Sequence, residues 1–397
     1  MEKEINKKVA VFYFPFFNFL FGSASSTRFS NIGYFLKNNG WDVFYIGSNI
    51  FENSCREKET ECGTIISVNK RNKLKIEKLL FNRITATQNE RFLFSRFPNP
   101  DLLFVSSYDP KHYYPKNILK HYETKTTKVI ISIMEHYSLK QFDYSLIQIK
   151  QTYFNNKFIN KFYSEKAYVM PISTYLSNHF ESRGNKTYVV PFAFDKELIK
   201  PAKHLQNEKL VFLYVGVPFK KDDIFTPIEG FLALNKEETP LIDVHLVGVD
   251  EKYFLKHGKK KLLNSIKKAN FIHLHGRIPY QEVEYYYNIA DFTFLMRDPT
   301  TRTSKAGFPT KVCESLFKGI PVITNSTSDL NKYLINEENS ILVKDYSYLA
   351  FLDSIRVALK INKKRLDEMK IISREKAEEE LSTNAVLPAF LEFLNKK

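Results

Sequence analysis

The chain of 397 residues has few cysteines and no long uninterrupted apolar run. Its three cysteines fit a reducing compartment better than a disulfide-stapled secreted fold. Cys55 and Cys62 lack a second cysteine pair and a nearby histidine couple, so they do not predict a zinc site. The apolar run over residues 9–22 is shorter than the roughly 20 residues of a membrane span and lacks a signal-peptide cleavage pattern. These absences predict a cytoplasmic protein without a transmembrane anchor.

The composition is otherwise that of an ordinary globular protein, with 43% hydrophobic and 26% charged residues. The chain has 59 Lys and Arg against 44 Asp and Glu, which gives a formal net charge of +15. A basic surface attracts polyanions, including nucleotide phosphates and anionic lipid. The basic residues are spread along the chain and no aromatic–basic RNA motif occurs, so no nucleic-acid partner is expected. A non-enzymatic polyanion-binding protein remains an alternative.

Short β-branched or aromatic runs alternate with amphipathic stretches along the whole chain. This alternation is typical of βαβ units, which build parallel sheets covered by helices on both faces. The predicted strands are 9–13, 43–46, 102–105, 129–133, 168–172, 188–190, 210–215, 244–247, 271–274, 292–295 and 321–324. The predicted helices are 28–38, 224–234, 253–267, 281–289, 311–317, 330–334 and 385–394.

At about 150 residues per domain, the chain length predicts two or three domains. The segment 191–205, with two prolines and a polar run, is the predicted linker. We expect an N-terminal Rossmann-like domain over 1–195, a second over 205–375, and a C-terminal helix within 376–397 that packs back on the first. Two such domains would face each other across a cleft, and ligands bind beyond the carboxyl ends of parallel strands.

The most informative loop covers 306–314, AGFPTKVCE, and runs into a predicted helix. Backbone amides at a helix start form an anion site, and Thr310 could cap this helix. Lys311 opposes the helix dipole unless an anion lies there. Glu314 follows one turn later on the same face, where a carboxylate could accept two ribose hydroxyls. A plain surface pair between Lys311 and Glu314 is the alternative.

A second loop, GVPFKKDD over 216–223, lies between a predicted strand and a predicted helix. Lys220 and Lys221 could reach a diphosphate from this loop, although paired lysines are often simply solvated. Asp222 or Asp223 would cap the helix that follows. The loop therefore predicts a second source of positive charge beside the first.

Further candidates are three arginines and an aromatic stretch. Arg277, after the predicted strand 271–274, could fork onto phosphate or stack on a base, or be a solvated loop residue. Arg297 and Arg302 flank the 306–314 loop and could contact a sugar or an anionic acceptor, or be structural. The aromatic stretch Phe14–Phe21 could line an acceptor pocket, touch lipid or pack in the core.

Together, in order and spacing, these motifs resemble the retaining glycosyltransferases of the GT-B fold, specifically glycosyltransferase family 4 (group 1). The resemblance covers nearly the whole chain and is best where GRIPYQEVEYYYNIADFTFL, AGFPTKVCES and GIPVITNSTSDLNKYL follow one another. In the N-terminal half, GSASSTRFSNIGYFLKNNGWDV is similar to the family's first β–α unit, and ISTYLSNHFESRG with VVPFAFD is similar to its passage before the linker. The resemblance implies an α/β GT-B fold with two Rossmann-like parallel-sheet domains facing across a cleft.

The resemblance also implies roles for individual residues. Lys221, with Lys220 as alternate, and Arg277 would hold the diphosphate or lie near the base. Lys311 would add positive charge at the leaving diphosphate, and Glu314 would bind the ribose hydroxyls. The loop over the transferred sugar and phosphates would consist of Gly307, Phe308, Pro309 and Thr310.

The sequence departs from the family pattern at three positions. The first glutamate of the family's E-x7-E motif, which usually contacts the donor sugar, falls at Ala306, so the resemblance does not specify the sugar. Asp222 stands where the family has glycine, and Val217 stands where it has arginine.

Cleavage of the sugar–phosphate bond leaves new negative charge on the nucleoside diphosphate, and preorganised cations stabilise it. With lysine and arginine in that role and no D-x-D motif, we expect neither a metal ion nor a cofactor. On the acceptor side, Glu135 or His136 could orient or deprotonate the incoming hydroxyl. A structural role for His136 is the alternative.

The sequence thus predicts an enzyme that moves a sugar from a UDP- or GDP-linked donor to a saccharide or lipid-linked acceptor. By resemblance, the setting would be polysaccharide, lipopolysaccharide or glycolipid assembly, with peripheral contact at the inner face of the cell membrane. A nucleotide-sugar 2-epimerase shares the architecture and remains an alternative. An epimerase needs acid–base carboxylates around the sugar, and Ala306 supplies none.

Overall fold

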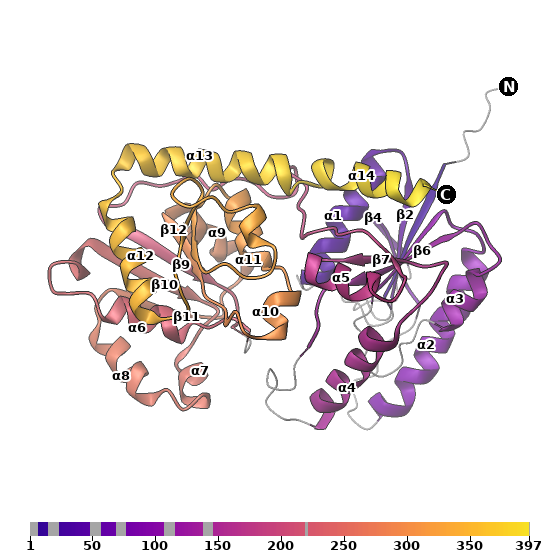
Figure 1. Cartoon of the computed structure of the whole chain (residues 1–397), viewed down its shortest axis with the longest axis horizontal. Coiled ribbons are helices and arrows are strands. Elements are labelled where there is room, and N and C mark those ends of the chain that lie inside the picture. The colour runs from indigo at the N-terminus through magenta and orange to yellow at the C-terminus, as the bar shows by residue number, and fades with distance from the viewer. Residues whose placement is uncertain are drawn as a thin grey trace. The chain divides into compact units, whose positions relative to one another are not determined.

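The structure, a computed structural model, describes residues 7–14, 24–47, 57–68, 77–106, 116–137, 146–218 and 221–396. It divides into two compact units (Figure 1): unit 1 is Met1–Asp195 with Thr383–Lys397, and unit 2 is Lys196–Ser382. The chain passes between units after residue 195 and again after residue 382. The prediction placed the start of the C-terminal segment at 376, seven residues before Thr383. Both units are α/β with largely parallel sheets, which is the predicted fold class.

Unit 1 contains an eight-stranded sheet in the order β3-β4-β2-β1-β5-β6-β7-β8. Neighbouring strands pair in parallel, except that β3 runs antiparallel to β4. The central strands are apolar because helices cover both faces of such a sheet. The strands are β1 (Val9–Tyr13), β2 (Asp42–Gly47), β3 (Glu57–Thr60), β4 (Gly63–Ser67), β5 (Leu102–Ser106), β6 (Lys128–Ile133), β7 (Tyr168–Pro171) and β8 (Lys186–Thr187).

Two strand predictions differ from the structure of unit 1. The hairpin of β3 and β4 was not predicted, because β3 has the charged sequence EKET and lacks an apolar alternation. The predicted strand 188–190 is wrong, since β8 ends at Thr187. The N–H of Tyr188 still donates to the carbonyl oxygen of Val169, at 3.1 Å.

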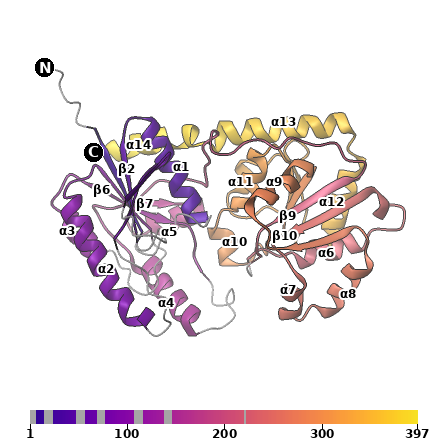
Figure 2. The ribbon, with the colours of Figure 1, turned by 180° about the vertical axis from the view of Figure 1, so that it is seen from behind.

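The C-terminal helix α14 (Thr383–Asn395) belongs to unit 1 and packs beside α1 (Ala24–Asn38), as Figure 2 shows. Its ring of Phe390 lies 6.5 Å from that of Phe104, and the ring of Phe393 lies 5.8 Å from that of Tyr168. This apolar face therefore packs against residues of β5 and β7 in unit 1. The other helices of unit 1 are α2 (Glu77–Arg96), α3 (Lys116–Tyr122), α4 (Leu146–Lys161) and α5 (Thr174–Glu181).

Unit 2 contains a six-stranded sheet in the order β11-β10-β9-β12-β13-β14, and all its neighbouring strands are parallel. Since the strands are parallel, all their carboxyl ends lie at one edge. The strands are β9 (Leu210–Val215), β10 (Ile242–Val247), β11 (Ile272–Gly276), β12 (Phe292–Leu295), β13 (Val322–Thr324) and β14 (Ser340–Leu342).

Helices cover both faces of the unit 2 sheet. On one face, the ring of Phe231 in α6 lies 5.2 Å from that of Phe212 and 5.4 Å from that of Phe351 in α12. Leu213 points to the opposite face, as alternation along a strand requires, and packs with Tyr287 of α9. The helices of unit 2 are α6 (Phe225–Leu232), α7 (Glu251–Lys256), α8 (Lys260–Lys268), α9 (Tyr280–Ile289), α10 (Arg302–Ala306), α11 (Thr310–Phe317), α12 (Tyr348–Lys360) and α13 (Lys363–Glu380).

Two helix predictions in unit 2 are wrong. The predicted helix 253–267 is the pair α7 and α8, broken at Gly258, where φ is +69°. The predicted helix 330–334 is a short 3₁₀ helix, Leu330–Lys332.

Candidate active site

Three glycines lie in the loops at the carboxyl edge of the unit 2 sheet and allow these loops to approach one another closely. Gly216, Gly248 and Gly276 follow or end β9, β10 and β11, with φ of +126°, +92° and +61°. These values favour glycine. A Cβ on Gly248 would lie 2.6 Å from the carbonyl carbon of Gly216, so the two loops touch at their backbones. This edge is where parallel sheets bind ligands.

A buried aspartate joins two cations at this edge, and we call Asp222, Arg297 and Lys311 the Asp222 cluster. Asp222 Oδ1 lies 2.8 Å from both Nε and Nη2 of Arg297, and Oδ2 accepts from Lys311 Nζ at 2.6 Å. The side chains of Asp222 and Arg297 are 1% and 4% exposed, whereas that of Lys311 is 27% exposed. The cluster therefore carries one net positive charge and presents it to solvent through Lys311.

The charges of the cluster fix the protonation states around it. Burial alone would raise the pKa of Asp222, but Lys311, Arg297 and the adjacent Lys221 hold that pKa well below its usual range. The ammonium of Lys311 also lies over the ring of Tyr214, 5.4 Å from its centroid. Burial, and then the charge of Asp222, raise the pKa of Tyr214 well above its ordinary value. At neutral pH, Asp222 is thus a carboxylate and Tyr214 a neutral phenol.

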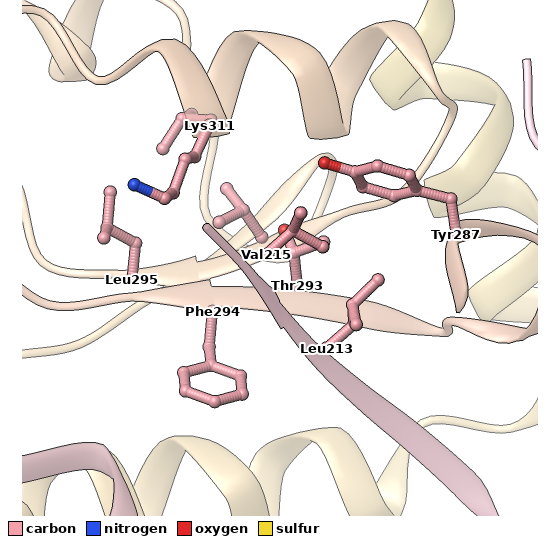
Figure 3. A pocket seen from close by; sticks show the side chains of 9 residues that line it. Leu213, Val215, Tyr287, Thr293, Phe294, Leu295 and Lys311 are labelled. Carbon is pink, nitrogen blue, oxygen red and sulfur yellow. The ribbon is translucent and has the colours of Figure 1, made fainter. Parts of the chain in front are cut away.

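The side chain of Lys311 reaches Asp222 by passing over Gly216. A Cβ on Gly216 would lie 2.6 Å from Lys311 Cε, so the lysine occupies the space of a side chain at that position. In Figure 3, Lys311 hangs from α11 above the sheet and Tyr287 approaches from α9. The gap below Lys311 has a volume of about 10 Å³, roughly the room of one water. It is a packing gap and too small for a ligand.

The helix α11 begins without a side-chain cap. Pro309 is its N-cap residue and makes no side-chain capping bond, and Thr310 is the first helical residue. The prediction that the Thr310 hydroxyl caps this helix is therefore wrong, because Thr310 lies one position too late. The amides of Val312 and Cys313 donate to the carbonyl oxygen of Pro309, so the start of α11 offers those of Thr310 and Lys311 to an anion.

Glu314 lies one turn beyond Lys311, half-buried in α11. Burial raises the pKa of Glu314 above its ordinary value. The charges of Lys318 and Lys311 and a hydrogen bond with Tyr287 offset only part of this shift. Lys311 makes its ion pair with Asp222, so the alternative of a plain surface pair between Lys311 and Glu314 does not describe this site.

The remaining predicted donor-site residues differ in exposure. Lys221 is half-buried next to Asp222, and Lys220 lies outside the described residues. Arg277 is exposed at the end of β11, two strands away from β9 at the same edge of the sheet. The structure thus brings Lys221 and Lys311 together around Asp222 and places Arg277 farther along.

The predicted glycine–proline loop is buried from Gly307 to Pro309, and Thr310 is half-buried. The carbonyl oxygen of Gly307 accepts from Arg297 Nη1 at 3.4 Å, and the ring of Phe308 packs edge-on against that of Tyr333. Pro309 is buried as well. Ala306, at the position of the family glutamate, is 0% exposed at the end of α10.

The acceptor-side candidates lie in unit 1, after β6. His136 is 2% exposed, with its ring 5.2 Å from that of His179, and Glu135 is half-buried. The structure therefore shows His136 packed among aromatic rings. Most of the aromatic stretch Phe14–Phe21 lies outside the described residues.

Sequence reasoning missed the pairing of Asp222 with Arg297. It left Asp222 and Asp223 interchangeable as helix caps, but Asp223 Oδ1 accepts from the N–H groups of Phe225 and Thr226, at 2.8 and 3.3 Å. Asp223 thus satisfies the start of α6, and Asp222 turns to the cations. The adjacent pair of acids after two lysines was the available signal.

In the described part of the chain, no group of three or more His, Cys, Asp or Glu side chains is arranged to hold a metal ion. Among the helices described there, none combines the length and the apolar character needed to cross a membrane.

The family described as glycosyl transferases group 1 matches residues 195–376, which include all of the candidate site in unit 2. Residues 195–376, slightly less than half of the chain, are thus similar to group 1 glycosyltransferases. The chain is a transferase enzyme. No curated protein matches its sequence.

Solved structures similar to this glycosyltransferase share its fold at low identity. Sucrose-phosphate synthase from Thermosynechococcus elongatus is 14% identical, with 98% of each chain covered and a TM-score of 0.71. Anabaena HepE in complex with UDP and glucose is 12% identical, with 98% of this chain and 99% of that chain covered and a TM-score of 0.65. WaaG, a glycosyltransferase involved in lipopolysaccharide biosynthesis, is 14% identical, with 96% and 98% covered and a TM-score of 0.60. These GT-B glycosyltransferases have the same two-sheet α/β architecture.

Proposed function

We propose that this glycosyltransferase moves a sugar from a UDP- or GDP-linked donor to a saccharide or lipid-linked acceptor, with retention of anomeric configuration, as in glycosyltransferase family 4. The observation that carries the proposal is the Asp222 cluster, which lies at the ligand-binding edge of the sheet with a net positive charge. HepE, of the same fold, holds UDP and glucose, which supports a UDP-sugar as the first donor to examine.

The donor diphosphate would lie against Lys311, the uncapped start of α11 and Lys221. When the sugar–phosphate bond breaks, these fixed cations and amides stabilise the charge that develops on the leaving diphosphate. Arg277 would contact the diphosphate or the base from the end of β11, and Glu314 would accept the ribose hydroxyls. The proposal requires no metal ion and no cofactor.

On the acceptor side, Glu135 or His136 would orient or deprotonate the incoming hydroxyl. The proposed setting is polysaccharide, lipopolysaccharide or glycolipid assembly in the cytoplasm, with peripheral contact at the inner face of the membrane. Its support is the similarity in fold to WaaG together with the formal charge of +15.

The test is a thermal-shift panel of UDP, GDP, ADP and CMP, followed by the matching sugar nucleotides. A ligand that binds only the folded state raises the melting temperature. One nucleotide family should raise it in the wild type, and the rise should be lost in Glu314→Ala. Donor use in Glu314→Ala or Lys221→Ala should fall by about tenfold or more, which is about 1.4 kcal/mol.

Matched controls are Glu237→Ala and Lys236→Ala, exposed residues of the loop after α6, on the opposite edge of the sheet. They should keep the wild-type response. Wild-type donor kinetics in both site variants would refute the site assignment.

Two other functions predict different outcomes. A 2-epimerase would convert a UDP-sugar to its isomer without any acceptor, which product analysis detects. A polyanion-binding protein would respond to no nucleotide and would bind nucleic acid with a steep salt dependence. The buried Ala306 disfavours the epimerase, because it offers no acid–base carboxylate.

A further inference from the structure

We propose that Asp222 is a positioning residue, which is itself held by the buried Arg297 and holds Lys311 in fixed orientation for the diphosphate of the donor. The inference rests on the proposed function, because the diphosphate belongs to the proposed donor. It assigns a role to a residue that stands where the family pattern has glycine.

Both carboxylate oxygens of Asp222 contact cations. Oδ1 receives Arg297 through two nitrogens at 2.8 Å, and Oδ2 receives Lys311 at 2.6 Å. The side chain of Lys311 runs from α11 over Gly216, and its ammonium lies over the ring of Tyr214. Its ammonium is thus fixed before any ligand arrives.

Arg297 connects this anchor to two more loops. Its N–H donates to Asn325 Oδ1 at 3.0 Å, Asn325 Nδ2 donates back to its carbonyl oxygen at 2.7 Å, and Nη1 reaches the carbonyl oxygen of Gly307. One network therefore ties the loop after β9, the ends of β12 and β13, and the loop before α11. A ligand that meets Lys311 meets a rigid edge, which is what electrostatic preorganisation requires.

A buried ion cluster is a poor device for stability alone, because apolar residues of the same volume often stabilise as well or better. The competing role for Asp222 is charge balance, and the two roles predict different effects on turnover. Removing a negative charge beside an anion site strengthens anion binding, whichever role holds. Only the positioning role also predicts slower chemistry, because Asp222 would no longer hold Lys311 in place for the diphosphate.

The decisive variant is Asp222→Asn, assayed as release of UDP or GDP from a panel of UDP- and GDP-sugars. We expect kcat to fall at least tenfold, while Kd for UDP, GDP and inorganic pyrophosphate, measured by calorimetry, stays within threefold of wild type or becomes tighter. A kcat within twofold of wild type, or a Kd that weakens in proportion to the loss of turnover, would overturn the inference.

Asp291→Asn is the matched control. Asp291 is also buried, pairs with Lys370 at 2.8 Å and accepts from the N–H of Val211, at the amino-terminal edge of the same sheet. Both variants should lose stability, and only Asp222→Asn should change kcat.

A thermodynamic cycle needs no activity and covers the case in which Asp222→Asn folds but is too unstable for kinetic assays. Asp222→Asn, Lys311→Met and the double variant are compared by urea unfolding. The double variant should unfold with an equilibrium constant at least tenfold smaller than the product of the single effects predicts. Once Asp222 is uncharged, Lys311→Met no longer breaks an ion pair, and it removes the repulsion between Lys311 and Arg297. Additive effects would refute the cluster. If the wild type releases no nucleotide from any donor, the proposed function fails, and the cycle still decides whether Asp222 fixes Lys311.

Discussion

At Gly216, a side chain from another element occupies the space that any larger residue would need. A Cβ there would lie 2.6 Å from Lys311 Cε, and φ is +126°, which L side chains rarely adopt. We therefore expect Gly216→Ala to displace Lys311 from Asp222 and to cost about 1–3 kcal/mol of unfolding free energy. Urea unfolding measures the cost, and the thermal-shift response to UDP or GDP should be lost.

Gly258→Ala separates the clash from the backbone cost. Gly258 also has a positive φ, +69°, but nothing lies within 4 Å of a Cβ built there. This control should lose stability and keep its nucleotide response. A full nucleotide response in Gly216→Ala would contradict the proposed path of Lys311.

Single residues were predictable from the sequence by type, and their partners were not. The loop AGFPTKVCE marked Lys311 and Glu314, but the partner of Lys311 lies 89 residues earlier in the chain. Arg297 meets the same carboxylate across 75 residues. Pairing at such separations depends on strand order, which a single sequence pattern does not contain. The choice between Asp222 and Asp223 needed the geometry of the first turn of α6.

At the scale of elements, β10 and β11 carry three histidines on adjacent strands. His245 Nδ1 lies 2.9 Å from His275 Nε2, the hydroxyl of Tyr286 lies 3.1 Å from His275 Nδ1, and His273 faces Asp243 at 3.5 Å. Burial, and then the charges of His273 and His275, lower the pKa of His245 to about 4, while Asp243 opposes the shift. Burial lowers the pKa of His275 as well.

These lowered values predict a loss of stability in mild acid. The unfolded chain, with an ordinary histidine pKa of about 6.5, binds more protons than the folded chain between that pH and about 4. The stability of unit 2 should therefore be full above about pH 6.5 and fall as the pH drops toward 4. Urea unfolding across this range should give a shallower decline in His245→Asn than in wild type.

Part of the decline should remain in that variant, because burial also lowers the pKa of His204 to about 4. Ion-paired carboxylates such as Asp222 have a folded pKa below the ordinary value. Their contribution to the free energy of unfolding is therefore lost only at lower pH. An identical pH dependence in wild type and His245→Asn would contradict the role of this cluster.

Elements were predictable where the apolar pattern was regular. The sequence predicted β1, β9 and β12 with the bounds that the structure has. It missed α13, whose sequence KKRLDEMKIISREKAEEE has few apolar positions, and β3, which is charged. In both cases neighbouring elements decide the structure, because local periodicity is too weak to do so.

At the scale of the whole molecule, unit 1 is built from two separate stretches of chain. Its second stretch, α14, buries Leu387, Phe390 and Leu394 in unit 1, and Thr383 Oγ1 donates to Asp195 Oδ2 at 2.8 Å. Ending the chain at Ser382 should therefore destabilise unit 1. Phe390→Ala alone should cost about 3 kcal/mol, because it leaves a cavity against Phe104 and Tyr188.

Trp41, the single tryptophan, lies in unit 1 and reports its unfolding by fluorescence. In urea, the fluorescence transition should move to lower concentration in the truncated chain and in Phe390→Ala. Circular dichroism should retain a second transition from unit 2, whose sheet has none of its strands in the removed segment. Glu392→Ala, an exposed position on the same helix, should behave as wild type. If truncation left the Trp41 transition unchanged, α14 would be an appendage and residues 1–195 would fold alone.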